Sequence, residues 1–463
     1  LVEWAATQPW SDGNVGMVGI SYFAMTQLEA ATQKPPHLKA IFPVAVTTDL
    51  YEAARPHGLF NSSFLSPFLA MIGITSAHGD ELWRGRLLEA ARHVLEIPRL
   101  HKKFATMNGE AAVTVMKRAM RLHYDPHPWD DLWQAVAVDH QVRDEWWDER
   151  NLLPVLDQVE IPVYLGCDWQ NVPLHLPGTF STLAALTNSP EVRVAMLGEF
   201  GLTWPWESLH VEALAWFDHW LKGADTGILD GPPIRYRLPG TDDWRTAEQW
   251  PPPESRPLTL ALGSDGALAP GDGVPGARSY VCPGPGLNHQ LGRATDPATS
   301  LAWETEPLDT DLDLAGDVEL RLEAAATALD TAWIALLEDV APDGTAETVT
   351  QGWLQASLRA VDEQASRPGA PVLACRTPAA IPVDEVVSYR IPLVANARRF
   401  AAGHRVRLVV CSDDQPDDIP AVMAFRHAPV GTTSHNTIHA TSKLVLSVLP
   451  PTTSPGAAPE VAP

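Results

Sequence analysis

The chain contains 463 residues, of which 45% are hydrophobic and 19% are charged, and its formal net charge is −24. This composition is typical of a globular protein, and the length suggests about three domains. No apolar run approaches the roughly eighteen residues that a transmembrane helix needs, so no membrane partner is expected. The excess of acidic side chains repels phosphate groups, so nucleic acid is not an expected partner either.

The cysteines are few and widely spread, and they form no CxxC pair: Cys167, Cys282, Cys375 and Cys411. Because paired cysteines usually mark zinc sites, we expect no metal and no cofactor. Most of these cysteines lie in or beside apolar runs, which favours buried free thiols and a cytoplasmic location. No signal peptide is visible, and the chain begins with Leu1 rather than methionine, so we expect the start of the gene to lie upstream.

The N-terminal segment, residues 1–54, alternates between apolar strands and helices. A strand is predicted over residues 15–20, a helix over 21–32 and a second strand over 37–46. This alternation is typical of a parallel sheet with crossover helices, and it assigns residues 1–54 to the first part of an α/β core.

Residues 55–150 are helical in pattern, show no strand-like alternation, and are predicted to form a helical cap inserted into the core. Residues 151–235 resume the α/β pattern and form the second part of the core. Strands are predicted over 161–167 and 192–197, a helix over 179–186, and a long closing helix over 209–221.

Residues 236–450 are predicted to form an all-β jelly-roll sandwich domain, and 451–463 a disordered tail. Three consecutive prolines at 251–253 mark a boundary near the start of this domain. Short alternating runs then follow at close intervals, and the predicted strands are 258–262, 318–323, 332–337, 388–393, 405–410 and 443–448.

A serine turn joins the first strand to the first long helix. The run from Gly19 to Ala24 places Ser21 where a strand ends and a helix begins. Such a sharp turn lifts a hydroxyl out of the sheet edge and presents it to an incoming carbonyl group. We therefore predict that Ser21 is a catalytic nucleophile; a structural serine at a turn is the alternative.

Four separated segments closely resemble the cocaine-esterase and X-prolyl dipeptidyl-peptidase (CocE/NonD) family of serine hydrolases. They are the approach and elbow at residues 10–24, the closing helix at 216–223, and two β-domain signatures at 336–344 and 403–408. The last glycine of the family elbow is replaced by Ala24. The resemblance implies an α/β-hydrolase core, a helical cap and a C-terminal jelly roll, together with hydrolysis of an ester or amide.

The resemblance also implies front strands and a tyrosine hydroxyl that helps to bind the oxyanion. Neither is contained in this sequence. The backbone N–H of Tyr22, directly after the nucleophile, is therefore the predicted oxyanion donor.

The catalytic acid implied by the resemblance falls after the strand at 161–167. The position that the family acid would occupy holds Gln170, whose side chain can orient an imidazole but cannot stabilise an imidazolium by charge. Asp168 lies two positions earlier and is the predicted acid; a solvated loop aspartate is the alternative.

The catalytic base implied by the resemblance falls after the strand at 192–197, where the slot holds Leu202. Leucine cannot accept a proton, so another residue must replace it. His210, at the start of the closing helix, is the predicted base. The alternatives are His175, His219, Glu199 and Glu207.

Two functions follow from these patterns. The first is a serine hydrolase, of the acyl esterase or X-Pro dipeptidyl-peptidase type, that forms an acyl-enzyme at Ser21 and acts on a small-molecule ester or amide. The second is a degenerate family member that acts as a binding or scaffold protein or as a non-hydrolytic enzyme, because Leu202, Gln170 and Ala24 depart from the family pattern. The oligomeric state stays open, with a homodimer as one alternative.

Overall fold

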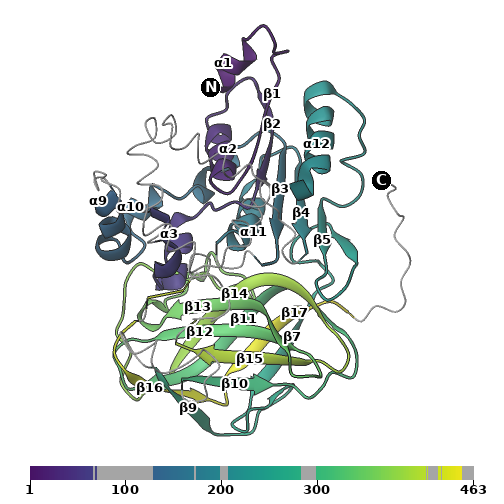
Figure 1. The fold of residues 1–463 in the computed structure, drawn as a ribbon. Helices are drawn as coiled ribbons and strands as arrows, with labels where there is room; N and C mark the ends of the chain where they lie inside the picture. The colour runs from purple at the N-terminus through teal and green to yellow at the C-terminus, as the bar shows by residue number, and fades with distance from the viewer. Residues whose placement is uncertain are drawn as a thin grey trace, which may run out of the picture.

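The structure is a computed structural model of the chain, in which an α/β unit sits on an all-β unit (Figure 1). It describes residues 1–65, 68–69, 129–170, 174–198, 207–282, 299–412, 414, 426–428 and 430–450. Most of the predicted helical cap therefore lies outside the described residues. The part of it at 129–150 contains two short α-helices, α9 (Trp129–Gln134) and α10 (Glu145–Asp148).

The α/β unit is built on one six-stranded sheet in the order β1-β2-β3-β4-β5-β6. Its first five strands are parallel and the last pair is antiparallel. The strands are β1 (Val15–Ile20), β2 (Leu38–Val44), β3 (Val163–Asp168), β4 (Val192–Leu197), β5 (Ile234–Arg237) and β6 (Trp244–Ala247). The parallel α/β core predicted from the alternating pattern is confirmed.

Helices cover both faces of this sheet. They are α1 (Val2–Ala6), α2 (Tyr22–Thr32), α3 (Leu50–Ala54), α11 (Leu176–Ala185) and α12 (His210–Lys222). A Cβ on Gly16 would meet Phe217 of α12, whereas a Cβ on Gly19 would meet Phe23 of α2. Because successive residues of a strand point to opposite faces, this offset of three residues places α2 and α12 on opposite sides of β1.

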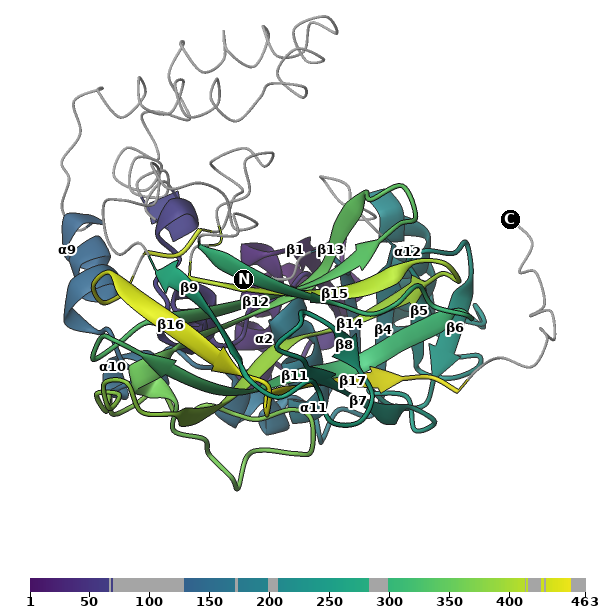
Figure 2. The same ribbon diagram turned by 90° about the horizontal axis from the view of Figure 1, so that it is seen from below.

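The all-β unit is a curved, largely antiparallel array (Figures 1 and 2). Its strands are β7 (Arg256–Leu262), β8 (Leu268–Ala269), β9 (Ala277–Cys282), β10 (Ser300–Glu304), β11 (Leu312–Ala326), β12 (Ala332–Val340), β13 (Ala346–Gln355), β14 (Val387–Phe400), β15 (Arg405–Cys411), β16 (Ser434–His439) and β17 (Lys443–Val448). Each of the six predicted strands lies within one of them. The predicted domain boundary between residues 235 and 236 falls inside β5, because β5 and β6 complete the α/β sheet by pairing beyond β4.

The two units share one buried junction at the carboxyl ends of the parallel strands. Trp169, directly after β3, accepts a hydrogen bond from Asn396 Nδ2 at 3.2 Å. His57, on the chain that follows β2 and α3, lies with Nδ1 2.9 Å from the carbonyl oxygen of Trp353 in β13. Trp353 belongs to the same buried cluster as Val44 and Ala24. The β unit therefore closes the sheet edge where ligands of α/β folds usually bind.

The four cysteines are buried and free, as predicted for most of them. Among the described residues, no helix combines the length and the hydrophobicity that a bilayer crossing requires.

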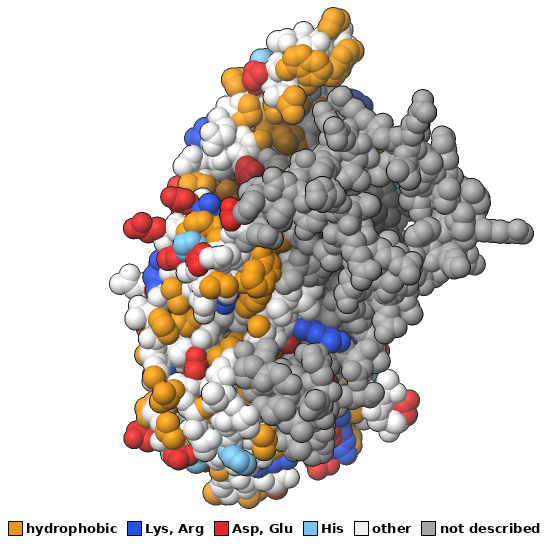
Figure 3. Space-filling view, turned by 60° about the vertical axis from the view of Figure 1, so that its left-hand side comes forward, with side chains coloured by type: hydrophobic (Ala, Val, Ile, Leu, Met, Phe, Trp, Pro, Cys, Tyr) orange, Lys and Arg blue, Asp and Glu red, His pale blue; other side chains and the backbone are white. Residues whose placement is uncertain are grey.

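The outer edge of β1 pairs with no strand in the described part of the chain. Large apolar side chains lie exposed around it, at Trp4, Trp10, Val18, Tyr22 and Phe23. Hydrophobic side chains gather near the top of the face that Figure 3 shows, where α1 and the start of β1 lie. This edge offers unpaired backbone groups together with an apolar surface.

Replacement of Gly178 by alanine should destabilise the junction. A Cβ at this third residue of α11 would lie 2.5 Å from the carbonyl oxygen of Val46, in the loop after β2. Because neither backbone can move freely, we expect Gly178→Ala to lower the free energy of unfolding by about 1–3 kcal/mol, measured by urea denaturation. Gly198→Ala is the matched control, since its Cβ would meet nothing closer than 3.7 Å. Equal stabilities of the two variants would contradict this packing.

Candidate active site

Ser21 occupies a strained turn between β1 and α2. Its backbone angles are φ 59° and ψ −118°, a conformation that L-residues other than glycine rarely adopt. The turn is fixed on both sides: the Ser21 N–H donates to Val44 O at 2.9 Å, and Ser21 O accepts the N–H of Ala24 at 2.8 Å. Strain of this kind persists only where the surrounding structure enforces it, and it clusters at functional sites. The sharp strand-to-helix turn predicted from the sequence is therefore present, and the role of Ser21 as nucleophile stays a prediction.

The residues around the turn leave the serine accessible. Ser21 is half-buried, and Tyr22 and Phe23 are 61% and 59% exposed. Buried Gln27 ties α2 to the sheet, because its Nε2 donates to Gly19 O at 3.3 Å and its Oε1 accepts the Phe42 N–H at 3.1 Å. Gln27 was not singled out from the sequence, since a glutamine within a helix carries no local signal of such a role.

Tyr22 is the first residue of α2. The first N–H groups of a helix have no partner within the helix and carry partial positive charge, which suits them to an oxyanion. The assignment of the Tyr22 N–H as oxyanion donor stays a prediction.

Asp168 is the last residue of β3 and is only 3% exposed. The alternative that it is a solvated loop aspartate is therefore wrong. Its strand pairs with β2 at Gly166 and Val44, and Val44 also accepts the Ser21 N–H. Asp168 and Ser21 thus lie at the same edge of the sheet, two strands apart. The role of Asp168 as catalytic acid stays a prediction, and Gln170 follows it in the adjoining turn.

His175 is buried directly before α11, with Nδ1 2.9 Å from Thr47 Oγ1. Burial lowers the pKa of His175 to about 4. An imidazole with so low a pKa accepts a proton poorly at neutral pH. This environment favours a structural role for His175, joining α11 to the loop after β2.

His210 and His219 lie on α12, nine residues apart. His210 is exposed at the first residue of the helix, which follows the carboxyl end of β4 in the chain. His219 is in the last turns, with Nδ1 3.0 Å from Ala224 O. Nine helical residues span about 13 Å, so the two imidazoles lie near opposite ends of the helix. Leu202 and Glu199 lie outside the described residues, as does the side chain of Glu207.

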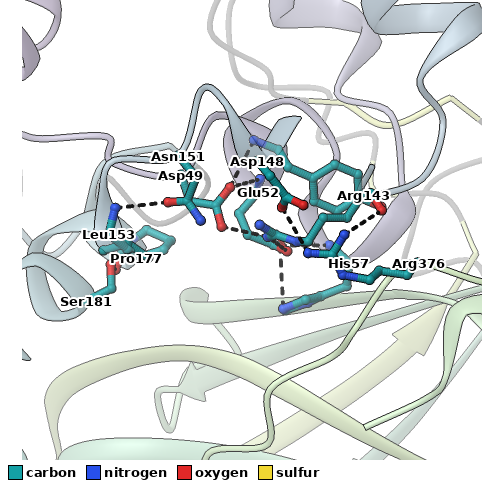
Figure 4. A network of polar contacts seen from close by, with 11 residues as sticks. Asp49, Glu52, His57, Arg143, Asp148, Asn151, Leu153, Pro177, Ser181 and Arg376 are labelled. Atoms are coloured by element: carbon teal, nitrogen blue, oxygen red, sulfur yellow. Dashed lines mark hydrogen bonds and ion pairs between the residues drawn. The ribbon is translucent and has the colours of Figure 1, made fainter. Parts of the chain in front are cut away.

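A cleft of about 660 Å³ lies between the α/β unit and the β unit. One wall carries an ionic network in which Arg143 Nη2 lies 2.6 Å from Asp49 Oδ2 and 3.1 Å from Glu52 Oε1 (Figure 4). Burial and the neighbouring Glu52 carboxylate raise the pKa of Asp49. Ser21 is not among the described residues that line this cleft. The cleft therefore lies beside the carboxyl edge of the sheet, but Ser21 is not part of the wall that the described residues form.

Replacement of Ser21 by glycine should stabilise the fold while removing the nucleophile. Glycine adopts positive φ without steric cost, so relief of strain should outweigh the added entropy of the unfolded chain. We expect Ser21→Gly to raise the free energy of unfolding by about 1 kcal/mol relative to Ser21→Ala, which keeps the strained Cβ. A glycine variant less stable than the alanine variant in urea would contradict the strained geometry.

His175 should make stability depend on pH. Its folded pKa of about 4 lies below the ordinary histidine pKa of 6.5, so between these pH values the unfolded chain binds a proton that the folded chain excludes. The contribution of His175 to the free energy of unfolding is fully present above pH 6.5 and decreases as the pH falls. From pH 7 to pH 5 we expect wild type to lose about 2 kcal/mol more than His175→Gln in urea unfolding. The exposed His435→Gln variant should follow wild type, and a His175→Gln profile parallel to wild type would contradict a buried neutral imidazole.

Comparisons with known proteins match both units. Residues 1–207 match the family model described as X-Pro dipeptidyl-peptidase (S15 family), and residues 226–441 match the X-Pro dipeptidyl-peptidase C-terminal non-catalytic domain. The chain is 26% identical to cocaine esterase from Rhodococcus sp. (strain MB1 Bresler), over 90% of this chain and 75% of that protein.

Solved structures support the same fold. A CocE/NonD family hydrolase from Staphylococcus aureus superimposes with a TM-score of 0.74 at 22% identity, covering 97% of this chain and 74% of that one. An α-amino acid ester hydrolase superimposes with a TM-score of 0.68 at 17% identity, covering 96% and 79%. The two family models follow each other along nearly the whole chain, and the protein belongs to the X-Pro dipeptidyl-peptidase (CocE/NonD) family of serine hydrolases.

Proposed function

We propose that this protein hydrolyses a small-molecule ester or amide through an acyl-enzyme formed at Ser21. The observation that carries the proposal is the backbone of Ser21, a non-glycine residue at φ 59° held between β1 and α2. Nothing in the packing of the fold requires a serine there, since glycine would relieve the strain. A strained serine at the carboxyl edge of a parallel sheet is the arrangement that serine hydrolases of this fold use for attack.

The chemistry assigned to the site is acyl transfer. Ser21 Oγ attacks the carbonyl carbon, and the Tyr22 N–H stabilises the oxyanion that forms. The sequence predicts Asp168 as the acid and His210 as the base, and both assignments remain predictions. Membership of a family of esterases and peptidases supports hydrolysis as the reaction class. The net charge of −24 favours a neutral or cationic substrate over an anionic one.

Turnover of 4-nitrophenyl acetate, 4-nitrophenyl butyrate and an X-Pro 4-nitroanilide tests the proposal. We expect wild type to hydrolyse at least one of them, and Ser21→Ala to lose about a thousandfold or more in kcat/KM. A fluorophosphonate probe should label wild type and not Ser21→Ala. The matched control is Ser264→Ala, a partly exposed turn position in the β unit that should keep wild-type turnover and labelling.

Two outcomes would contradict this function. Equal turnover by wild type and Ser21→Ala would remove Ser21 from the reaction. A well-folded wild type with neither labelling nor turnover would favour the degenerate alternative, in which the departures at Leu202, Gln170 and Ala24 have left a binding or scaffold protein.

A further inference from the structure

Gln27 is a polar residue in the middle of an apolar layer. It is the sixth residue of α2, which lies beside β1 and β2 (Figure 1), and it is only 1% exposed. The other buried side chains near it on this helix are apolar, among them Ala24, Leu28 and Ala31. A buried amide has lost its hydrogen bonds to water, so it is stable only where protein groups replace them.

Three backbone groups replace them for Gln27. Its Nε2 donates to Gly19 O at 3.3 Å and to Phe23 O at 2.8 Å, and its Oε1 accepts the Phe42 N–H at 3.1 Å. A carbonyl oxygen only accepts and a backbone N–H only donates, so these partners fix which end of the amide is nitrogen and which is oxygen. Both donor protons of the amide are therefore in use.

The three partners surround Ser21 along the chain. Gly19 lies two residues before Ser21, near the end of β1, and Phe23 lies two residues after it, in the first turn of α2. Phe42 lies in β2, two residues before Val44, which accepts the Ser21 N–H at 2.9 Å. One side chain thus joins the strand that enters the turn, the helix that leaves it, and the strand to which the turn is bonded.

This contact controls direction as well as distance. A methionine of similar length would fill the same space, but apolar contact is non-directional and does not set the angle between a helix and a strand. The backbone of Ser21 is strained at φ 59°, and a small rotation of α2 against β1 would let it relax. Gln27 opposes that rotation, and it does so in the turn that also carries the Tyr22 N–H.

The other buried side-chain amides of the described residues lie elsewhere. Asn396 donates to backbone carbonyls at the junction of the two units, and Asn436 contacts hydroxyl groups within the β unit. Asn61 has no side-chain partner within the described ranges. Among these buried amides, Gln27 is the one whose contacts lie within two residues of Ser21.

We propose that Gln27 is a positioning residue for Ser21, which holds the strand-to-helix turn at the angle where Ser21 Oγ and the Tyr22 N–H meet the same carbonyl group. The proposal rests on the proposed hydrolase function. Gln27 is buried beneath the turn and touches no substrate. Attack requires exact geometry between the hydroxyl and the carbonyl carbon, whereas binding depends on groups that Gln27 does not reach. Loss of Gln27 therefore lowers kcat and leaves KM unchanged.

Replacement of Gln27 by methionine tests this split. We expect Gln27→Met to lose about a hundredfold in kcat for the best 4-nitrophenyl ester, with the same loss in its rate of fluorophosphonate labelling. Its KM should stay within about twofold of wild type. The matched control is Thr32→Val, which removes a buried hydroxyl that donates to Glu29 O at 2.8 Å at the far end of the same helix. It should keep the wild-type kcat.

Replacement of Gln27 by glutamate tests the donor side of the amide. A protonated carboxyl has nearly the size of the amide and restores one donor, whereas an ionised one would face two carbonyl oxygens. Burial and these oxygens raise the pKa of the introduced carboxyl, so at about pH 5.5 we expect Gln27→Glu to exceed Gln27→Met in kcat by about tenfold. Equal kcat values of the two variants at that pH would overturn the proposal.

A measurement on the wild-type protein covers the case in which these variants fail to fold. The Gln27 Nε2 protons should exchange slowly with solvent and should change resonance frequency when Ser21 is phosphonylated. Rapid exchange, unmoved resonances, or a wild-type kcat in folded Gln27→Met would overturn the proposal. Labelling of wild-type Ser21 in any of these outcomes leaves the hydrolase function standing, whereas absence of labelling in wild type would remove that function itself.

Discussion

The structure depends on one backbone constraint, the left-handed turn at Ser21. The turn is held because the Ser21 N–H continues the pairing of β1 with β2 while its carbonyl already caps α2. Gln27 locks the same helix to both strands from the buried side. Because Ser21 ends the pairing of a strand and at the same time begins a helix, its φ cannot relax to a negative value. The packing of β1, β2 and α2 therefore keeps the backbone of Ser21 strained, with its side chain at the edge of the sheet.

The junction between the two units follows from the same edge of the sheet. Parallel strands end together, and the loops after β2 and β3 meet the β unit there through His57 and Trp169. The half-buried ionic network around Arg143 and the buried Asp414–His427 pair both lie along this junction. The β unit thus does more than cover the sheet, because it brings charged and titratable side chains to the side on which the nucleophile stands.

Local patterns predicted much of the fold and the turn at Ser21, because strand 15–20 is an apolar run, strand 192–197 is a largely buried one, and the elbow is a local motif. The start of α11 was placed three residues late, because Pro177 in its first turn masks the helical pattern. Strand β11 was predicted too short, because its first half carries Asp313 and Asp317, two buried carboxylates that pair with arginines distant in the sequence, Arg399 and Arg367. Asp414 accepts a hydrogen bond from an indole 61 residues away, that of Trp353, and no local signal in the sequence could reveal that contact.

The central claim is that Ser21 carries the acyl group during turnover. Acid quenching of the enzyme during hydrolysis of a slow aryl ester, followed by peptide mass analysis, tests it most directly. The account predicts that the peptide containing Ser21 gains the mass of the acyl group and loses it on further incubation before quenching. Sustained turnover with that peptide unmodified, or with the acyl group on another residue, would contradict the account.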